Sequence, residues 1–82
     1  METDYLTMAE ALQFIHECER RNAFIYGIER FTRESGMNVP DLDGIADFSS
    51  LPSQDVQKSI SSARDFLASF GRSKEERFKI VS

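Results

Sequence analysis

The stretch AFIYGIERF, residues 23–31, decides the fold because it is the clearest β-strand in the chain. It is rich in β-branched and aromatic residues, which favour strands. Apolar side chains occupy both of its alternating faces: Phe24, Tyr26 and Ile28 on one, Ala23, Ile25 and Phe31 on the other. We therefore expect a strand that is covered at least partly on both sides. Gly27 in its middle predicts a bulge or the close approach of another backbone.

Helical patterns lie on either side of this strand, near residues 7–21 and 53–70. Thr7 and Glu10 have the spacing of a capping box, in which each side chain satisfies a free backbone N–H of the first turn. Ser53 is the expected N-cap of the second helix. Apolar stripes recur at helical spacing, with Met8, Ala11, Leu12, Ile15 and Cys18 in the first helix and Val56, Ile60, Ala63, Leu67 and Phe70 in the second.

The remaining segments predict two further strands. ESG at residues 34–36 is a turn, and MNVP at 37–40 predicts a short strand that Pro40 ends. DLDG at 41–44 is expected to turn, and IADFSS at 45–50 to form a strand or an ordered loop. RFKIV, residues 77–81, predicts the last strand.

These elements predict one domain over residues 1–82 of class α+β. Two helices pack on one face of a small, mainly antiparallel sheet of three strands, built from about 23–31, part of 37–48, and 77–81. Six side chains are expected to be largely buried: Ile15, Ile25, Ile60, Leu67, Phe78 and Ile80.

The net charge of −4 and the sequence pI of about 4.9 argue against a nucleic-acid binder, which needs a basic surface to displace counterions from phosphates. An acidic chain can instead bind a basic protein. No signal-peptide pattern and no apolar run long enough to span a membrane is visible. We therefore expect a cytoplasmic protein.

Acidic residues are concentrated in residues 34–57, which contain five carboxylates and no Lys, Arg or His. The five are Glu34, Asp41, Asp43, Asp47 and Asp55. Hydrogen bonds within turns and a favourable position at a helix N-terminus could account for most of them one by one. Those local roles do not account for the missing bases, so a surface for a basic partner is the competing interpretation.

Candidate catalytic and metal sites are few. His16 and Cys18 lie two positions apart on one helix, so their side chains diverge, which argues against a pair of nucleophile and base. Asp41 and Asp43 have the spacing that opens a calcium loop, but Pro52 occupies the position where such a loop needs Glu. We expect no catalytic residue, no metal and no cofactor, and hence no enzyme.

The segments ALQFIHECERRNAFIYGIERF, residues 11–31, and LDGIADFSS, residues 42–50, resemble the small immunity proteins that bacteria make against their own secreted toxins. These include the immunity proteins of tRNA-cleaving colicins and of contact-dependent or polymorphic toxin systems. The resemblance lies in the order of elements and in a strand of the form aromatic-Ile-x-Gly-Ile-acid. It implies a small cytoplasmic protein without enzymatic activity, which binds a cognate toxin domain, frequently a basic nuclease, and blocks it.

The residues expected to contact such a partner come from charge and predicted exposure, because the resemblance does not specify them. They are Glu29, Glu34, Asp41, Asp43 and Asp47, with Tyr26 as an aromatic neighbour. Carboxylates can take the place of phosphates in the positive cleft of a nuclease. A small acidic adaptor or regulator, for instance of phage origin, that binds a basic host protein would use the same surface and is the alternative.

Overall fold

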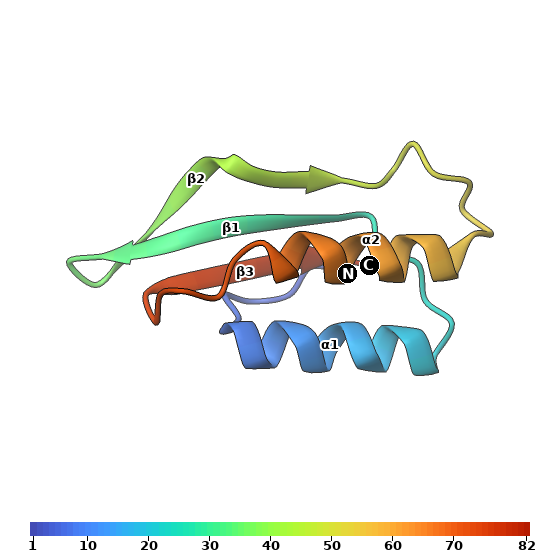
Figure 1. Cartoon of the computed structure of the whole chain (residues 1–82), viewed down its shortest axis with the longest axis horizontal. Helices are drawn as coiled ribbons and strands as arrows, with labels where there is room; N and C mark the ends of the chain where they lie inside the picture. The colour runs from blue at the N-terminus through green and yellow to red at the C-terminus, as the bar shows by residue number, and fades with distance from the viewer.

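The computed structural model describes all 82 residues and contains two helices and three strands. Their order is α1 (Met8–Arg20), β1 (Gly27–Glu34), β2 (Met37–Asp47), α2 (Val56–Ala68) and β3 (Glu76–Val81). The strands form one antiparallel sheet in the order β2-β1-β3 (Figure 1). The α+β class and the three-stranded sheet are therefore confirmed.

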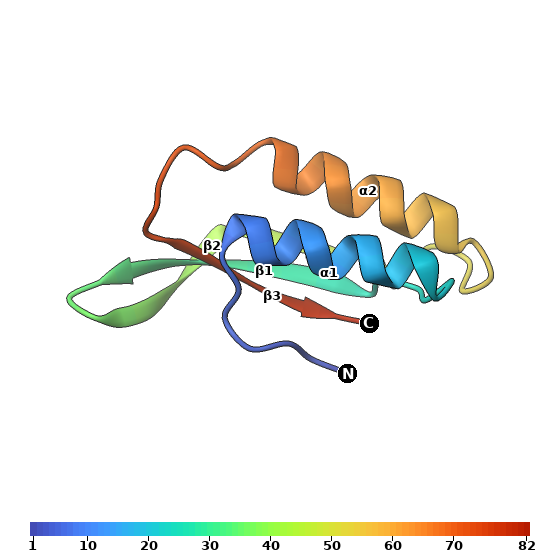
Figure 2. The ribbon, with the colours of Figure 1, turned by 90° about the horizontal axis from the view of Figure 1, so that it is seen from below.

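Both helices cover the same face of the sheet (Figure 2). The core between the helices and the sheet consists of buried apolar side chains, and the six that the sequence predicts are each at most 1% exposed. Ser59 is also fully buried. Its hydroxyl donates to the carbonyl of Val56 and accepts from the backbone N–H of Ile25, and it thereby joins α2 to the segment before β1.

The predicted signals at the helix ends are confirmed for α1 and corrected for α2. Thr7 and Glu10 form the expected capping box, and its hydrogen bonds lower the pKa of Glu10. Asp55, rather than Ser53, caps α2, because its carboxylate accepts from the N–H of Lys58. Leu12 was expected in the apolar stripe of α1 but is 45% exposed.

The central strand is displaced from its predicted position. β1 begins at Gly27 and continues to Glu34, whereas the sequence predicts residues 23–31. Its polar end becomes strand because it pairs with β2 across a two-residue turn, Ser35–Gly36, where both residues have positive φ. The close backbone approach expected at Gly27 is confirmed, since a Cβ there would lie 3.0 Å from the carbonyl oxygen of Ala46.

β2 is a single irregular strand at the edge of the sheet. Glu29 pairs with Ile45 and Phe31 pairs with Pro40, so the four residues 41–44 lie opposite Arg30 alone. The expected turn at 41–44 is therefore a bulge within the strand, and the prediction that Pro40 ends a short strand is wrong. Proline is tolerated because an edge strand needs backbone donors on one side only.

The N-terminal segment lies along the other edge of the sheet. Backbone hydrogen bonds join Thr3 to Ile80 and Leu6 to Phe78 on β3. Tyr5 packs edge-on against Phe31, with ring centroids 4.9 Å apart, and Phe31 is buried although its side chain lies on the face away from the helices. The central strand is therefore covered on both sides, as predicted, but only at this end.

Candidate functional site

The face of the sheet opposite the helices stays open around Gly27. Gly27 lies between Asp47 of β2 and Val81 of β3, and the next row across the same face is Ile45, Glu29 and Lys79. Ile28 and Ile80 point the other way, into the core. We call this part of the sheet the open face.

A groove of about 260 Å³ lies on the open face. Gly27 forms its floor because it has no side chain. Its other lining residues include the apolar Ile45 and Val81, the aromatic Tyr26, two acids, Glu29 and Asp47, and one base, Lys79. We call it the Gly27 groove. It brings together three of the six predicted site residues, which come from two strands and the segment before them.

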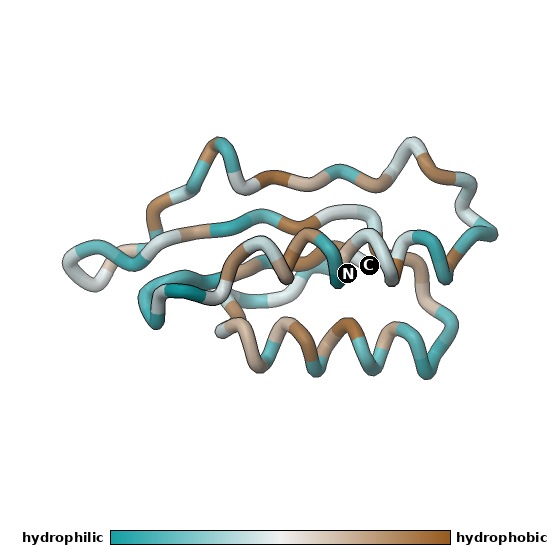
Figure 3. Tube along the Cα trace, in the orientation of Figure 1, coloured by the Kyte–Doolittle hydropathy of each residue, from teal (hydrophilic) through white to brown (hydrophobic).

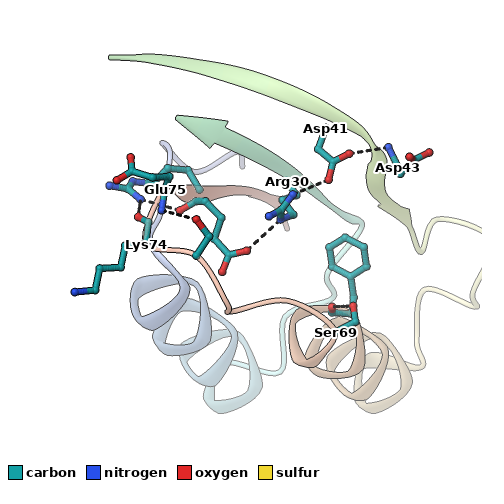
Figure 4. A network of polar contacts seen from close by, with 10 residues as sticks. Arg30, Asp41, Asp43, Ser69, Lys74 and Glu75 are labelled. Atoms are coloured by element: carbon teal, nitrogen blue, oxygen red, sulfur yellow. Dashed lines mark hydrogen bonds and ion pairs between the residues drawn. The ribbon is translucent and has the colours of Figure 1, made fainter. Parts of the chain in front are cut away.

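Asp41 is the predicted site residue whose surroundings differ most from an exposed acidic surface. Its carboxylate accepts from Arg30 at 2.7 Å and from the backbone N–H of Asp43 at 3.1 Å (Figure 4). Arg30 also donates to the buried Glu76 at 3.1 Å, and its guanidinium lies 4.8 Å from the ring centroid of Phe70. Burial opposes the charge on Arg30, but the two carboxylates outweigh it and raise the pKa of the guanidinium.

Residues 34–57 contain no base, but in the folded chain a base from another segment lies against them. Arg30 on β1 supplies a cation beneath the bulge and neutralises Asp41. Two more acids of this stretch also have local roles, because Asp47 accepts from the N–H of Ser49 and Asp55 caps α2. The interpretation by turn and cap chemistry thus accounts for three of the five acids, and leaves Glu34 and Asp43.

The other predicted site residues are exposed but not all adjacent. Asp43 lies in the bulge of β2, one residue from Gly44 and two from Ile45. Glu34 lies at the far end of β1, where it pairs with Met37 beside the hairpin turn. Tyr26 is 44% exposed and packs against Phe24. The structure thus places Glu34 away from the groove and the remaining exposed candidates in or near it.

Exposed apolar side chains accompany the acids along β2, and the sequence prediction did not include them. Leu42 is 82% exposed, Met37 69% and Ile45 53%. Figure 3 shows apolar segments recurring between polar ones along this edge strand. Leu42 lies in the bulge and Ile45 on the open face, so their exposure depends on the irregular pairing of β2 and not on a regular alternation in the sequence.

His16 and Cys18 lie on α1, which covers the opposite face of the sheet (Figure 2). His16 is exposed on α1, and Cys18 is buried at 4% exposure. Burial raises the pKa of the Cys18 thiol, which disfavours the reactive thiolate. No three His, Cys, Asp or Glu side chains are grouped closely enough to hold a metal ion, and no helix is long and apolar enough to cross a membrane.

A second hollow, of about 450 Å³, lies between the N-terminus of α1 and residues 71–77. Arg72, Lys74 and Arg77 line it, so its charge is opposite to that of the Gly27 groove. Arg77 already donates to the carbonyls of Lys74 and Glu76, and the Glu76 carboxylate adds a negative charge to the lining. The three cations outnumber this carboxylate, which already pairs with Arg30, so the hollow is positively charged.

Comparisons with known proteins provide no relative from which to assign a role. No family model, no curated protein and no solved structure matches the chain. The open face and its charges are therefore the basis for a functional assignment.

Proposed function

We propose that this chain is a small immunity-type protein, which binds a basic toxin domain and blocks it in the cytoplasm of the cell that produces the toxin. It acts by binding alone and catalyses no reaction. The contact surface is the open face with the adjoining part of β2, and the toxin domain is a basic nuclease.

The observation that carries the proposal is the combination of free carboxylates and exposed apolar side chains on the open face and the adjoining edge strand β2. Glu29 and Asp43 take part in no ion pair within the chain, although it has ten Lys and Arg residues. Ile45 and Leu42 lie beside them in exposed positions. Exposed apolar groups next to uncompensated charge are typical of a binding surface.

The chemistry of such a surface suits a protein that grips phosphates. A nuclease needs a positive cleft for its substrate. Carboxylates held on a rigid strand can form charge-assisted hydrogen bonds with the same cations, and they accelerate the encounter between the two proteins. The ladder between β1 and β2 and the Arg30–Asp41 ion pair hold the acidic strand in one place, which reduces the entropy lost on binding.

The experiment compares the wild-type chain with a Glu29→Gln/Asp43→Asn variant. Each tagged protein is used to capture partners from the cells of origin, and the captured protein is then produced in a test cell with and without the chain. We expect a basic partner that is toxic alone and harmless with the wild-type chain, and weaker protection by the variant. Equal protection by both proteins would place the contact on another surface.

The same experiment separates the adaptor alternative. A captured basic partner that has no toxicity, with or without this chain, would assign the protein to the adaptors or regulators. Gene order is an independent check, because an immunity gene lies directly after the gene of its toxin.

A further inference from the structure

The Gly27 groove is small for a ligand site. Pockets that bind cofactors and drug-sized molecules usually measure about 300–1,000 Å³. The groove has about 260 Å³ and is open to solvent along the sheet. Its size suits one side chain from a partner rather than a complete small molecule.

The carboxylate of Glu29 lacks the partner that the sheet register would provide. Lys79 lies directly across from Glu29 on β3. Its ammonium instead binds Glu2 at 3.0 Å and lies 4.7 Å from the ring centroid of Tyr5. Because the ammonium of Lys79 is bound to Glu2, Glu29 at the rim of the groove takes part in no ion pair within the chain.

Asp47 provides a second negative charge at the same groove. Its Oδ1 accepts from the backbone N–H of Ser49 at 2.9 Å, and the hydrogen bonds with Ser49 lower the pKa of the Asp47 carboxyl. The group is therefore ionised at neutral pH, and Oδ2 remains available to a partner. Asp47 and Glu29 are diagonal neighbours on adjacent strands, since they pair with Gly27 and Ile45. Diagonal neighbours lie about 7–8 Å apart, close enough for one planar cation to reach both.

We propose that the Gly27 groove receives an arginine side chain of the partner protein. The methylene stem packs over Gly27 between Ile45 and Val81, and the guanidinium binds the carboxylates of Glu29 and Asp47. This inference rests on the proposed function and specifies how the basic partner is recognised.

Arginine fits these features better than lysine. A guanidinium presents several donors in a plane and can bind two carboxylates at once, whereas an ammonium is a compact point charge. The two carboxylates outnumber the one lining base, Lys79, so the groove favours a cation over an anion.

The experiment needs only the purified chain. Backbone amide NMR shifts are followed while the capped tripeptide Ac-Ala-Arg-Ala-NH2 is added, with the citrulline peptide as a neutral control of the same shape. We expect saturable shifts at Gly27, Ile45 and Asp47, and an affinity at least about tenfold weaker for citrulline, as the loss of one charge-assisted hydrogen bond implies. Equal affinity for the two peptides would overturn the proposal.

Two variants of equal charge test the location. Glu29→Gln should lower the affinity for the arginine peptide about tenfold. Glu34→Gln, on the same strand but away from the groove, should leave this affinity within a factor of about two. Equal losses would show general attraction to an acidic surface and would refute the groove. If the peptide does not bind while the chain still protects against a toxin, the groove assignment fails and the proposed function stands. If the peptide binds and no toxin is neutralised, the groove assignment stands and the proposed function fails.

Discussion

The ion pair with Arg30 gives Asp41 a structural role. In sequence, Asp41 is one of five carboxylates in a stretch without a base, and in the fold it shares a partly buried cation with Glu76. Glu76 is 2% exposed, and only one of its carboxylate oxygens has a partner. A buried charge that loses its counter-ion is strongly destabilising, so we expect loss of Arg30 to act through folding.

Asp41 and Asp43 should therefore respond differently to the same substitution. Asp41→Asn removes the charge that faces Arg30 and should lower the free energy of unfolding by about 1–2 kcal/mol. Asp43→Asn changes an exposed side chain without an ion pair and should alter it by less than about 0.5 kcal/mol. Urea denaturation of both variants measures the difference. Equal stabilities would mean that the Arg30–Asp41 pair contributes nothing to folding.

His16 and Cys18 provide a test of the non-enzymatic assignment at the residue scale. The double variant His16→Ala/Cys18→Ser should keep full protective or binding activity. Its unfolding free energy should fall by about 1–3 kcal/mol, because a hydroxyl replaces a thiol at a buried position. Activity and circular dichroism are measured on the same sample. A double variant that folds but has no activity would contradict the non-enzymatic assignment.

At the scale of elements, one buried hydrogen bond joins α2 to the segment before β1, in addition to the apolar packing of the core. Ser59→Ala would leave the backbone N–H of Ile25 without an acceptor, and it should cost about 1–3 kcal/mol. Ser61 is a matched control, because its hydroxyl makes a similar bond to the carbonyl of Lys58 but is exposed. Ser61→Ala should change the unfolding free energy by less than about 0.5 kcal/mol. A similar cost in both variants would contradict the structural role of Ser59.

The hairpin between β1 and β2 contains a residue that its turn does not favour. Ser35 has φ of 52° and is followed by Gly36 at 79°, and a two-residue turn of this kind prefers Asn at the first position. A left-handed residue with a Cβ costs roughly 1–2 kcal/mol, and Asn tolerates that conformation better than Ser. Ser35→Asn should therefore raise the unfolding free energy by about 0.5 kcal/mol, measured by thermal denaturation. Ser35→Val is a control expected to act in the opposite direction. It should lower the unfolding free energy, because β-branched residues fit this conformation poorly.

At the scale of the whole molecule, the periodicity of apolar residues in the sequence predicted which surfaces are buried. The stripes of α1 and α2 and the alternation of Phe78 and Ile80 determine which surfaces are buried, and these predictions were confirmed except at Leu12, which is exposed. The limits of β1 were missed because Thr32, Arg33 and Glu34 form strand by pairing with β2, which no local propensity reveals. Ser59 was missed for a similar reason, since its partner is 34 residues away.

The candidate site was predictable in part. Exposure and charge located Tyr26, Glu29 and Asp47, which the fold brings to one groove. Asp41 could not be separated from them, because its neutralisation by Arg30 depends on a bulge that places four residues of β2 opposite one of β1. The groove itself requires Gly27 to pair with two strands at once, and that pairing is a property of the assembled sheet.

The distribution of free charge over the molecule leads to a prediction about binding kinetics. Glu29→Gln/Asp43→Asn removes two free carboxylates from the proposed surface, and Asp65→Asn/Glu75→Gln removes two exposed carboxylates elsewhere. The net charge of the chain changes equally, so long-range attraction to a basic toxin domain falls equally in both, and only the local contribution differs.

We expect the first variant to associate about tenfold more slowly at low salt, to show a shallower salt dependence and to dissociate faster, because carboxylates at the contact also slow dissociation. The second should dissociate at the wild-type rate. Stopped-flow measurements at about 20 mM and 300 mM salt resolve both rates, and equal dissociation rates in the two variants would locate the interface away from the open face.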